Sequence, residues 1–241
     1  MEVSHNALNR VFVAPWLYWA LLPIHRLLLS LYFSQIIIQG FEHLPVNGPV
    51  MLAPKHYSRW DPVVLALLSV EPLWYMTNAN QFGGVQGWII RRLGAFPVDL
   101  ARPQVSSFRS AIAVLTAGKK LMLFPEGGIV RDQPLRPLKS GFARLVLQAE
   151  SALGDGSIPI VPIAIGYQPN AVWRAKVIIH ILPPLCSKDV WQGNEKQTAI
   201  SLTQAVQESL LAGLREIGSG SEVASKTESG TDQEYEEGKE V

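Results

Sequence analysis

From residue 36 onward, short runs rich in β-branched and other apolar residues alternate with longer stretches in which apolar residues recur at helical spacing. Turn-forming residues bound the short runs, as is typical of strands that alternate with helices. The expected strands cover residues 36–39, 50–53, 73–76, 95–98, 121–124, 160–165 and 177–181, and the expected helices cover 62–70, 85–93, 104–117, 141–150 and 198–215. This order predicts an α/β fold with a mainly parallel central sheet of about seven strands, covered by helices.

Residues 11–38 form the most apolar segment of the chain, but two prolines and an arginine interrupt it. A membrane-spanning helix needs about 20 consecutive apolar residues, and an arginine at mid-bilayer is costly. We therefore expect residues 1–35 to form a two-helix membrane anchor, whose helices meet near Pro23 and Arg26 and dip into one leaflet. Its tryptophans and tyrosines suit a membrane interface. A true span, a signal peptide and a soluble helical hairpin are the alternatives.

The C-terminal segment differs in composition from the rest of the chain. Residues 216–241 contain eight acidic residues against two lysines, are rich in glycine and serine, and predict an acidic, disordered tail. The remaining residues 1–215 carry 19 basic and 12 acidic residues. This positive balance suits an anionic surface or a phosphorylated substrate, but the cations do not cluster as nucleic-acid binding requires. We expect one α/β domain over residues 36–215.

Several classes of site find no support in the sequence. Cys186 is the single cysteine, so an internal disulfide is excluded and a reducing compartment is expected. It follows two prolines in a loop-like stretch and is interpreted as a structural residue. The five histidines lack metal-ligand spacing, so no metal is expected, and no G-x-S-x-G motif marks a serine hydrolase.

The stretch KHYSRWDP, residues 55–62, holds the first candidate catalytic pair. His56 follows an expected strand, and Asp61 precedes a proline and an apolar run, which predicts Asp61 as a helix N-cap. Strand ends that precede helices are where α/β sheets place their sites. On a tight turn the two side chains can meet, and the carboxylate would then leave one imidazole nitrogen free as a base. The alternative is a polar loop residue beside a helix cap.

The stretch FPEGG, residues 124–128, holds the second candidate. Glu126 follows a buried strand, and Gly127 and Gly128 let the backbone turn sharply and bring amide groups near a ligand. Arg131 and two further cations follow, so the loop either binds a phosphate or is a solvated basic loop. Pro162 lies inside an expected strand, where a proline points to a sheet edge or a bulge.

The segments HYSRWD, GAFPVDLAR, FPEGG and IVPIAI, in this order, resemble the four signature blocks of the 1-acyl-glycerol-3-phosphate acyltransferase family, over about residues 40–184. The resemblance implies acyl transfer from acyl-CoA or acyl-carrier protein to a lysophospholipid hydroxyl. The expected acceptor is 1-acyl-glycerol-3-phosphate, and the expected product is phosphatidic acid. It also implies a cofactor-independent O-acyltransferase of phospholipid biosynthesis at the cytoplasmic face of a membrane.

The resemblance also implies roles for single residues. His56 would be the general base that takes a proton from the acceptor hydroxyl, and Asp61 would orient it. Arg102 and the turn at Glu126 match the blocks that bind the acceptor phosphate. Pro162 matches the fourth block, which shapes the acyl or donor side. Gly127, Gly128 and Arg131 complete the expected substrate-binding set.

The chain departs from the family pattern beside these blocks. Lys55 stands where asparagine is common, Arg131 is displaced by two positions, and Arg102 stands three residues after Asp99 instead of next to it. Two alternatives therefore stay open. One is the same chemistry on glycerol-3-phosphate, another lysophospholipid, or a glycolipid or terpenoid alcohol, and the other is a membrane scaffold without activity.

Overall fold

The structure is a computed structural model that describes residues 13–98, 105–154 and 156–236. Its seven strands form one sheet, in the order β1-β7-β6-β2-β5-β3-β4. The strands are β1 (Gln35–Gln39), β2 (Val50–Pro54), β3 (Trp74–Asn78), β4 (Ala95–Val98), β5 (Lys120–Met122), β6 (Ile160–Gln168) and β7 (Lys176–Ile181). Every neighbouring pair is parallel except β6 and β7. The predicted α/β fold with a mainly parallel seven-stranded sheet is confirmed.

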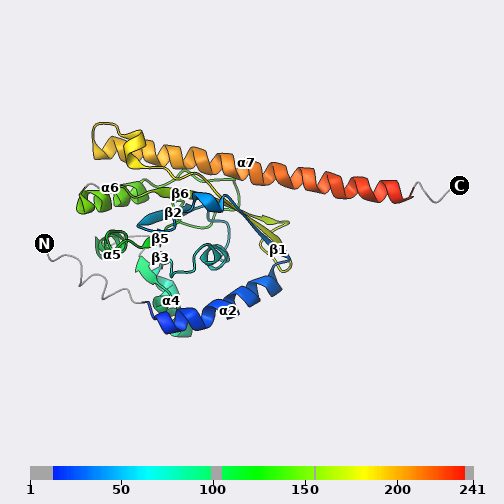
Figure 1. The fold of residues 1–241 in the computed structure, drawn as a ribbon, viewed down its shortest axis with the longest axis horizontal. Helices are drawn as coiled ribbons and strands as arrows, with labels where there is room; N and C mark the ends of the chain where they lie inside the picture. The colour runs from blue at the N-terminus through cyan, green and yellow to red at the C-terminus, as the bar shows by residue number, and fades with distance from the viewer. Residues whose placement is uncertain (1–12, 99–104, 155, 237–241) are drawn as a thin grey trace.

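Helices cover both faces of this sheet, as Figure 1 shows. The α-helices are α2 (Pro15–Tyr32), α3 (Asp61–Leu65), α4 (Gly84–Arg92), α5 (Val105–Thr116), α6 (Gly141–Leu153) and α7 (Glu195–Glu236). Four short 3₁₀ helices are η1 (Phe41–His43), η2 (Ala66–Leu68), η3 (Ala79–Phe82) and η4 (Ser187–Val190). Helices α5, α6 and α7 lie on one face, and α2 and α4 lie on the other (Figure 1).

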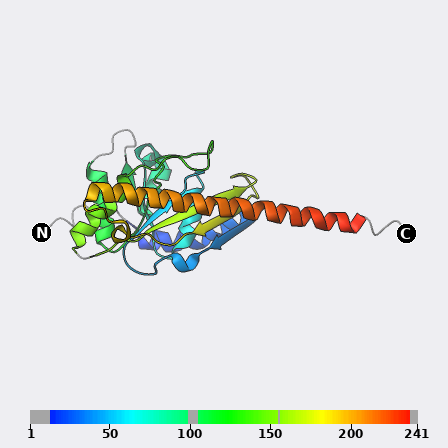
Figure 2. The same cartoon turned by 90° about the horizontal axis from the view of Figure 1, so that it is seen from above.

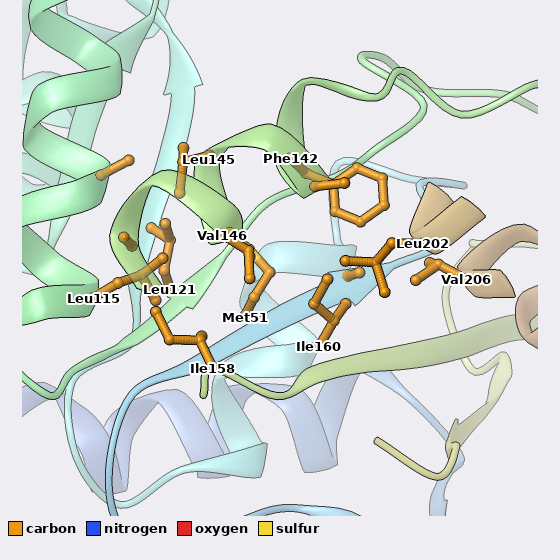
Figure 3. Close-up of a cluster of buried hydrophobic side chains, with 14 of the residues drawn as sticks. Met51, Leu115, Leu121, Phe142, Leu145, Val146, Ile158, Ile160, Leu202 and Val206 are labelled. Atoms are coloured by element: carbon orange, nitrogen blue, oxygen red, sulfur yellow. The ribbon is translucent and has the colours of Figure 1, made fainter. Parts of the chain in front are cut away.

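Two hydrophobic cores fill the spaces between the sheet and these helices. Side chains alternate between the two faces of a strand. In β2, Met51 and Ala53 accordingly pack in the core under α5, α6 and α7, part of which Figure 3 shows. Val50 and Leu52 pack in the second core, with residues of α2 and α3. All four side chains are fully buried, so β2 is the centre of the domain.

The N-terminal segment differs from the prediction. A single helix, α2, runs through Pro23. For the described part of the chain, the prediction of two helices that meet near this proline is therefore wrong. Leu17 and Leu29 are buried on either side of the proline, and this packing offsets the hydrogen bond that a proline removes from a helix. No helix of the described residues is long and apolar enough to cross a membrane. Residues 1–12 lie outside the described residues, and the anchoring role of residues 1–35 stays a prediction.

The last helix also differs from its expected bounds. Helix α7 crosses the sheet and continues to Glu236 instead of ending at Arg215 (Figures 1 and 2). Residues 195–236 contain no proline that would end a helix. Ile217, two residues past the expected end, is still buried against β6 and β7. The chain is therefore helical over most of the segment for which the composition predicts an acidic, disordered tail.

The strand β6 carries Pro162 in the middle of the sheet, between β7 and β2. Of the two positions predicted for this proline, the sheet edge is therefore wrong. The other, a bulge, agrees with the register between β6 and the β7 side. Ile163 pairs with Ile181, whereas Ile160 pairs with Leu185, so the β7 side holds one extra residue opposite Pro162. A proline that donates no hydrogen bond is tolerated at such an interruption of the ladder.

Candidate active site

The expected site residues gather at one edge of the sheet. β6, β2 and β5 are adjacent and parallel, so their carboxyl ends lie at the same edge. The turn after β2 carries His56, the loop after β5 carries Glu126, and β6 extends towards the same edge with Tyr167 near its end. α3 begins at Asp61, directly after the turn.

His56 and Asp61 meet in this turn. The imidazole Nδ1 lies 2.9 Å from Asp61 Oδ2, and Asp61 is fully buried, whereas the His56 side chain is 16% exposed. An ionised carboxylate only accepts hydrogen bonds, so this contact assigns the proton of the imidazole ring to Nδ1. Nε2 of the neutral ring is then free to accept a proton. The ring stacks on Phe124, with 3.9 Å between the centroids, which restricts its rotation.

Asp61 is held by main-chain and side-chain donors. Oδ2 also accepts hydrogen bonds from the amides of Tyr57 (2.6 Å) and Ser58 (2.7 Å), and Oδ1 accepts one from the hydroxyl of Tyr167 (2.7 Å). The predicted N-cap role is wrong, because the carboxylate turns back to the preceding turn and Trp60 occupies the cap position without a side-chain bond. The carboxylate therefore ties the turn together and orients the imidazole.

Glu126 holds the same turn from the side of β5. Its carboxylate is fully buried, and Oε1 accepts the main-chain amide of His56 at 2.8 Å. Oε2 accepts from Lys55 Nζ and from the amide of Arg136, each at 3.0 Å. Lys55 is 2% exposed and also donates to the carbonyl of Val130. The described contacts of Glu126 are with protein donors, and its contact with a substrate stays a prediction.

The loop after Glu126 presents exposed cations. Gly127 has φ +74°, and a Cβ atom there would lie 2.6 Å from Lys139 Nζ. Arg131, Arg136 and Lys139 all have exposed side chains. Arg131 Nε donates to the carbonyl of Tyr57 at 3.0 Å, which places this guanidinium group beside the turn that carries His56. Exposed cations on a loop with a glycine turn suit an anionic group of a substrate.

The structure thus brings His56, Asp61, Glu126 and Arg131 to one edge of the sheet. Arg102 lies outside the described residues. Pro162 is buried beside Ala53, inside the sheet. Two cavities of about 350 and 320 Å³ lie against α6 and α7, and the residues that line them belong to neither the turn nor the loop. The part of the chain that the structure describes contains no metal-binding group of three or more His, Cys, Asp or Glu residues.

Two residues of this site were not expected from the sequence. Lys55 was noted only as a departure from a family pattern, and nothing marked it as the partner of a carboxylate 71 residues away. Tyr167 ends the otherwise aliphatic stretch IPIVPIAIGY, and a buried hydroxyl that needs a hydrogen-bond partner was the available signal.

Comparisons with known proteins give a family match for this chain. The sequence profile of the Acyltransferase family matches residues 35–166, more than half of the chain. The chain is 27% identical to a 1-acyl-sn-glycerol-3-phosphate acyltransferase of Bacillus subtilis over 175 residues, which are 69% of this chain and 82% of that protein. It is 26% identical to the alpha enzyme of that name from Ovis aries over 200 residues, 78% of this chain but less than two thirds (65%) of that protein.

A solved structure supports the fold. The crystal structure of the 1-acyl-sn-glycerophosphate acyltransferase PlsC from Thermotoga maritima matches with a TM-score of 0.65 and 21% sequence identity. The match covers 88% of this chain and 87% of that one. At this identity the likeness shows that the two chains share their architecture.

Proposed function

Because the chain belongs to the Acyltransferase family and is an O-acyltransferase, we propose that it acylates the hydroxyl of a lysophospholipid. The preferred acceptor is 1-acyl-glycerol-3-phosphate, and the product is phosphatidic acid. The acyl donor is a thioester, either acyl-CoA or acyl-carrier protein. The observation that carries the proposal is the 2.9 Å contact between the His56 imidazole and the buried Asp61 carboxylate, next to a cationic loop.

The geometry of this pair suits general base catalysis. Nε2 of His56 takes the proton of the acceptor hydroxyl while the oxygen attacks the thioester carbonyl. Asp61 stabilises the imidazolium that forms, as a carboxylate does in a catalytic triad. When the tetrahedral intermediate collapses, the carbon–sulfur bond breaks and the imidazolium returns the proton to the thiolate. The acyl group passes directly to the acceptor, so no acyl-enzyme is formed.

The cationic loop would bind the acceptor phosphate. Arg131, Arg136 and Lys139 supply charge, Gly127 lets the Lys139 side chain pack against the turn, and Gly128 leaves the main chain open to a close approach. Arg102 joins this set in the proposal on the strength of its sequence block. Glu126 acts here through the loop and the amide of His56. Pro162 acts by shaping the strand that runs beside β2.

The exposed face of α2 supports attachment to a membrane surface. Six large apolar side chains of this helix are more than half exposed, namely Trp16, Trp19, Ile24, Leu27, Leu28 and Leu31. A helix with such a face lies in the interface between head groups and acyl chains. We propose that residues 1–35 attach the protein to the cytoplasmic face of a membrane. Residues 36–215 then form the catalytic domain, and residues 216–241 form an acidic appendage.

Substitution of the catalytic pair tests the mechanism. His56→Ala or Asp61→Asn should lower kcat by roughly 10²–10⁴-fold, because a positioned general base contributes about that much. His180→Ala is the matched control, because the His180 side chain is 18% exposed, close to the 16% of His56, and packs near α7 instead. Circular dichroism should show that His56→Ala and Asp61→Asn are folded, and both should keep the vesicle binding of the wild type. Near wild-type acyl transfer by His56→Ala or by Asp61→Asn would refute the mechanism.

A second candidate function keeps the chemistry and changes the acceptor. Arg131 stands two positions beyond the place where the family pattern has an arginine, and it donates to the main chain of Tyr57. The phosphate-binding arrangement of this chain therefore differs from the usual arrangement of the family. Glycerol-3-phosphate, another lysophospholipid or a glycolipid alcohol would then be the acceptor. Competition among these acceptors and lysophosphatidate for one labelled donor separates the two functions. A strong preference for lysophosphatidate would remove the second.

A further inference from the structure

Tyr167 reaches the catalytic pair from the far end of β6. Its hydroxyl donates to Asp61 Oδ1 at 2.7 Å, and both side chains are buried. The other carboxylate oxygen, Oδ2, accepts hydrogen bonds from His56 Nδ1 and from two main-chain amides. Among the described contacts, Oδ1 accepts its hydrogen bond from the hydroxyl of Tyr167. We propose that Tyr167 is a positioning residue for acyl transfer, and that its hydroxyl fixes the rotation of the Asp61 carboxylate and thereby the His56 imidazole. This inference rests on the proposed function.

The sheet register explains how a residue so far along the chain reaches Asp61. β6 is nine residues long, and its Ile163 pairs with Pro54, the last residue of β2. Tyr167 lies four residues further, so it stands beside the turn that follows β2. On its other side it pairs with Val177 of β7, which holds the backbone in place. The position of the hydroxyl is therefore set by regular strand pairing.

Ring packing restricts the tyrosine further. Its ring stacks on Tyr57, with 5.7 Å between the centroids, and lies 5.9 Å from the ring of Phe33. Tyr57 also belongs to the catalytic turn, and its own hydroxyl donates to Asn170 in the loop after β6. Contacts from both the ring and the hydroxyl thus join the end of β6 to the turn. A side chain held this firmly can define the orientation of a carboxylate.

The hydroxyl stays a donor under all working conditions. Burial, and then the negative charge of Asp61 and its hydrogen bond, raise the pKa of Tyr167 far above the ordinary value of 10. Because the phenol keeps its proton, it donates a hydrogen bond to Oδ1. This oxygen is then already paired, and Oδ2 accepts the hydrogen bond from His56 Nδ1. The carboxylate then presents Oδ2 to Nδ1 in one orientation.

Replacement of Tyr167 by phenylalanine removes the donor and keeps the ring. Oδ1 would be left buried without this partner, and the carboxylate could rotate away from Nδ1. We expect kcat to fall about tenfold, which corresponds to about 1.4 kcal/mol, with KM changed less than about twofold. The charge of Asp61 would also be less compensated, so the acid limb of the kcat/KM profile should move to higher pH. Arg59, Lys55, Glu126 and Arg131, which are charged residues in or beside the turn, are unchanged in this variant.

A double variant separates a positioning role from a structural one. If Tyr167 acts through Asp61, the Asp61→Asn/Tyr167→Phe variant should be no slower than Asp61→Asn alone. Thr203→Val is the control, because Thr203 is also buried and its hydroxyl donates to the carbonyl of Ala199 within α7, away from the site. It should keep the kcat and the pH profile of the wild type. The unfolding midpoint of each variant shows that the kinetics refer to folded protein.

The outcomes are distinct from those that test the proposed function. Full activity of His56→Ala and Asp61→Asn would remove the general base mechanism itself. With that mechanism intact, the inference is overturned if Tyr167→Phe keeps kcat within twofold of the wild type and the acid limb does not move. It is also overturned if the double variant loses the same factor again on top of Asp61→Asn, because Tyr167 would then act independently of the carboxylate.

Discussion

The buried ion pair of Lys55 and Glu126 makes a sharp prediction about stability. Lys55 Nζ lies 3.0 Å from Glu126 Oε2, and the two side chains are 3% and 0% exposed. Lys55→Met keeps most of the apolar stem and removes the ammonium group. The Glu126 carboxylate is then buried without an opposite charge, although the amides of His56 and Arg136 still donate to it. The carbonyl of Val130 loses its donor as well.

The expected cost follows from what remains around Glu126. Removing one partner of a buried ion pair costs about 3–5 kcal/mol. The two remaining amide donors place this case at the low end, at about 3 kcal/mol. For a chain of this size, such a loss lowers the unfolding midpoint by roughly 6–12 °C. The pair is buried, so moderate salt should change this difference little.

Unfolding in urea and by heat measures the effect. The double variant Lys55→Met/Glu126→Gln removes both charges and should be more stable than the sum of the two single losses predicts, by roughly 1–3 kcal/mol. Lys120→Met is the control, because Lys120 Nζ donates to the carbonyl of Val46 at the surface, and its loss should stay within about 0.5 kcal/mol. If Lys55→Met unfolds as the wild type does, or the two losses add, the carboxylate does not depend on Lys55 and the reasoning fails.

Three further predictions concern the loop, the tyrosines and α2. Gly127→Ala forces a side chain into φ +74° and against Lys139, so KM for a phosphorylated acceptor should rise more than kcat falls. Gly83→Ala is the control, because Gly83 lies outside the loop and a Cβ atom there meets no atom within 4 Å, and it should match the wild type in steady-state kinetics. Burial raises the pKa of Tyr75 from 10 to about 12, so the folded protein keeps a proton that the unfolded chain loses. The free energy of unfolding should accordingly be unaffected by Tyr75 below pH 10 and fall between pH 10 and about 12, by about 1.4 kcal/mol per unit, and Tyr75→Phe should flatten this fall in denaturation curves. Trp19→Ser should reduce partitioning into anionic vesicles by roughly tenfold in a sedimentation assay. Trp191→Ser is the control and should leave the partitioning unchanged. The two tryptophans are 54% and 53% exposed, but of the two only Trp19 lies on α2.

Much of the fold could be predicted from the sequence because its signals are local. Each of the seven strands is a short apolar run between turn residues, and the helical stretches between them require parallel neighbours. The position of β7 between β1 and β6 could not be predicted, because pairing depends on contacts between distant segments. The continuity of α2 through Pro23 depends on the same kind of contact, since buried Leu17 and Leu29 hold the helix on both sides.

The site was predictable where its residues are close in sequence. His56 and Asp61 are five residues apart, so a turn that joins a strand to a helix brings them together. The end of the strand at Glu126 was also visible, but the ion pair with Lys55 was not, because both residues are buried only once two strands are adjacent. Tyr167 is 106 residues from Asp61 and meets it across a sheet whose order no local pattern encodes.

The sheet order itself positions the His56 side chain. Leu52 of β2 pairs with Met122 of β5, an offset of 70 residues, and the same offset separates His56 from Glu126. Beyond the end of β5, the carboxylate of Glu126 therefore accepts the His56 amide where a strand carbonyl would otherwise lie. On the opposite side, the Lys55 amide donates to Ile163 of β6, and β6 continues to Tyr167 and the Asp61 carboxylate. Side chains from β5 and β6 thus extend the pairing of β2 past its last residue, and they hold the turn rigid at the point where a mobile loop would let the imidazole lose its orientation.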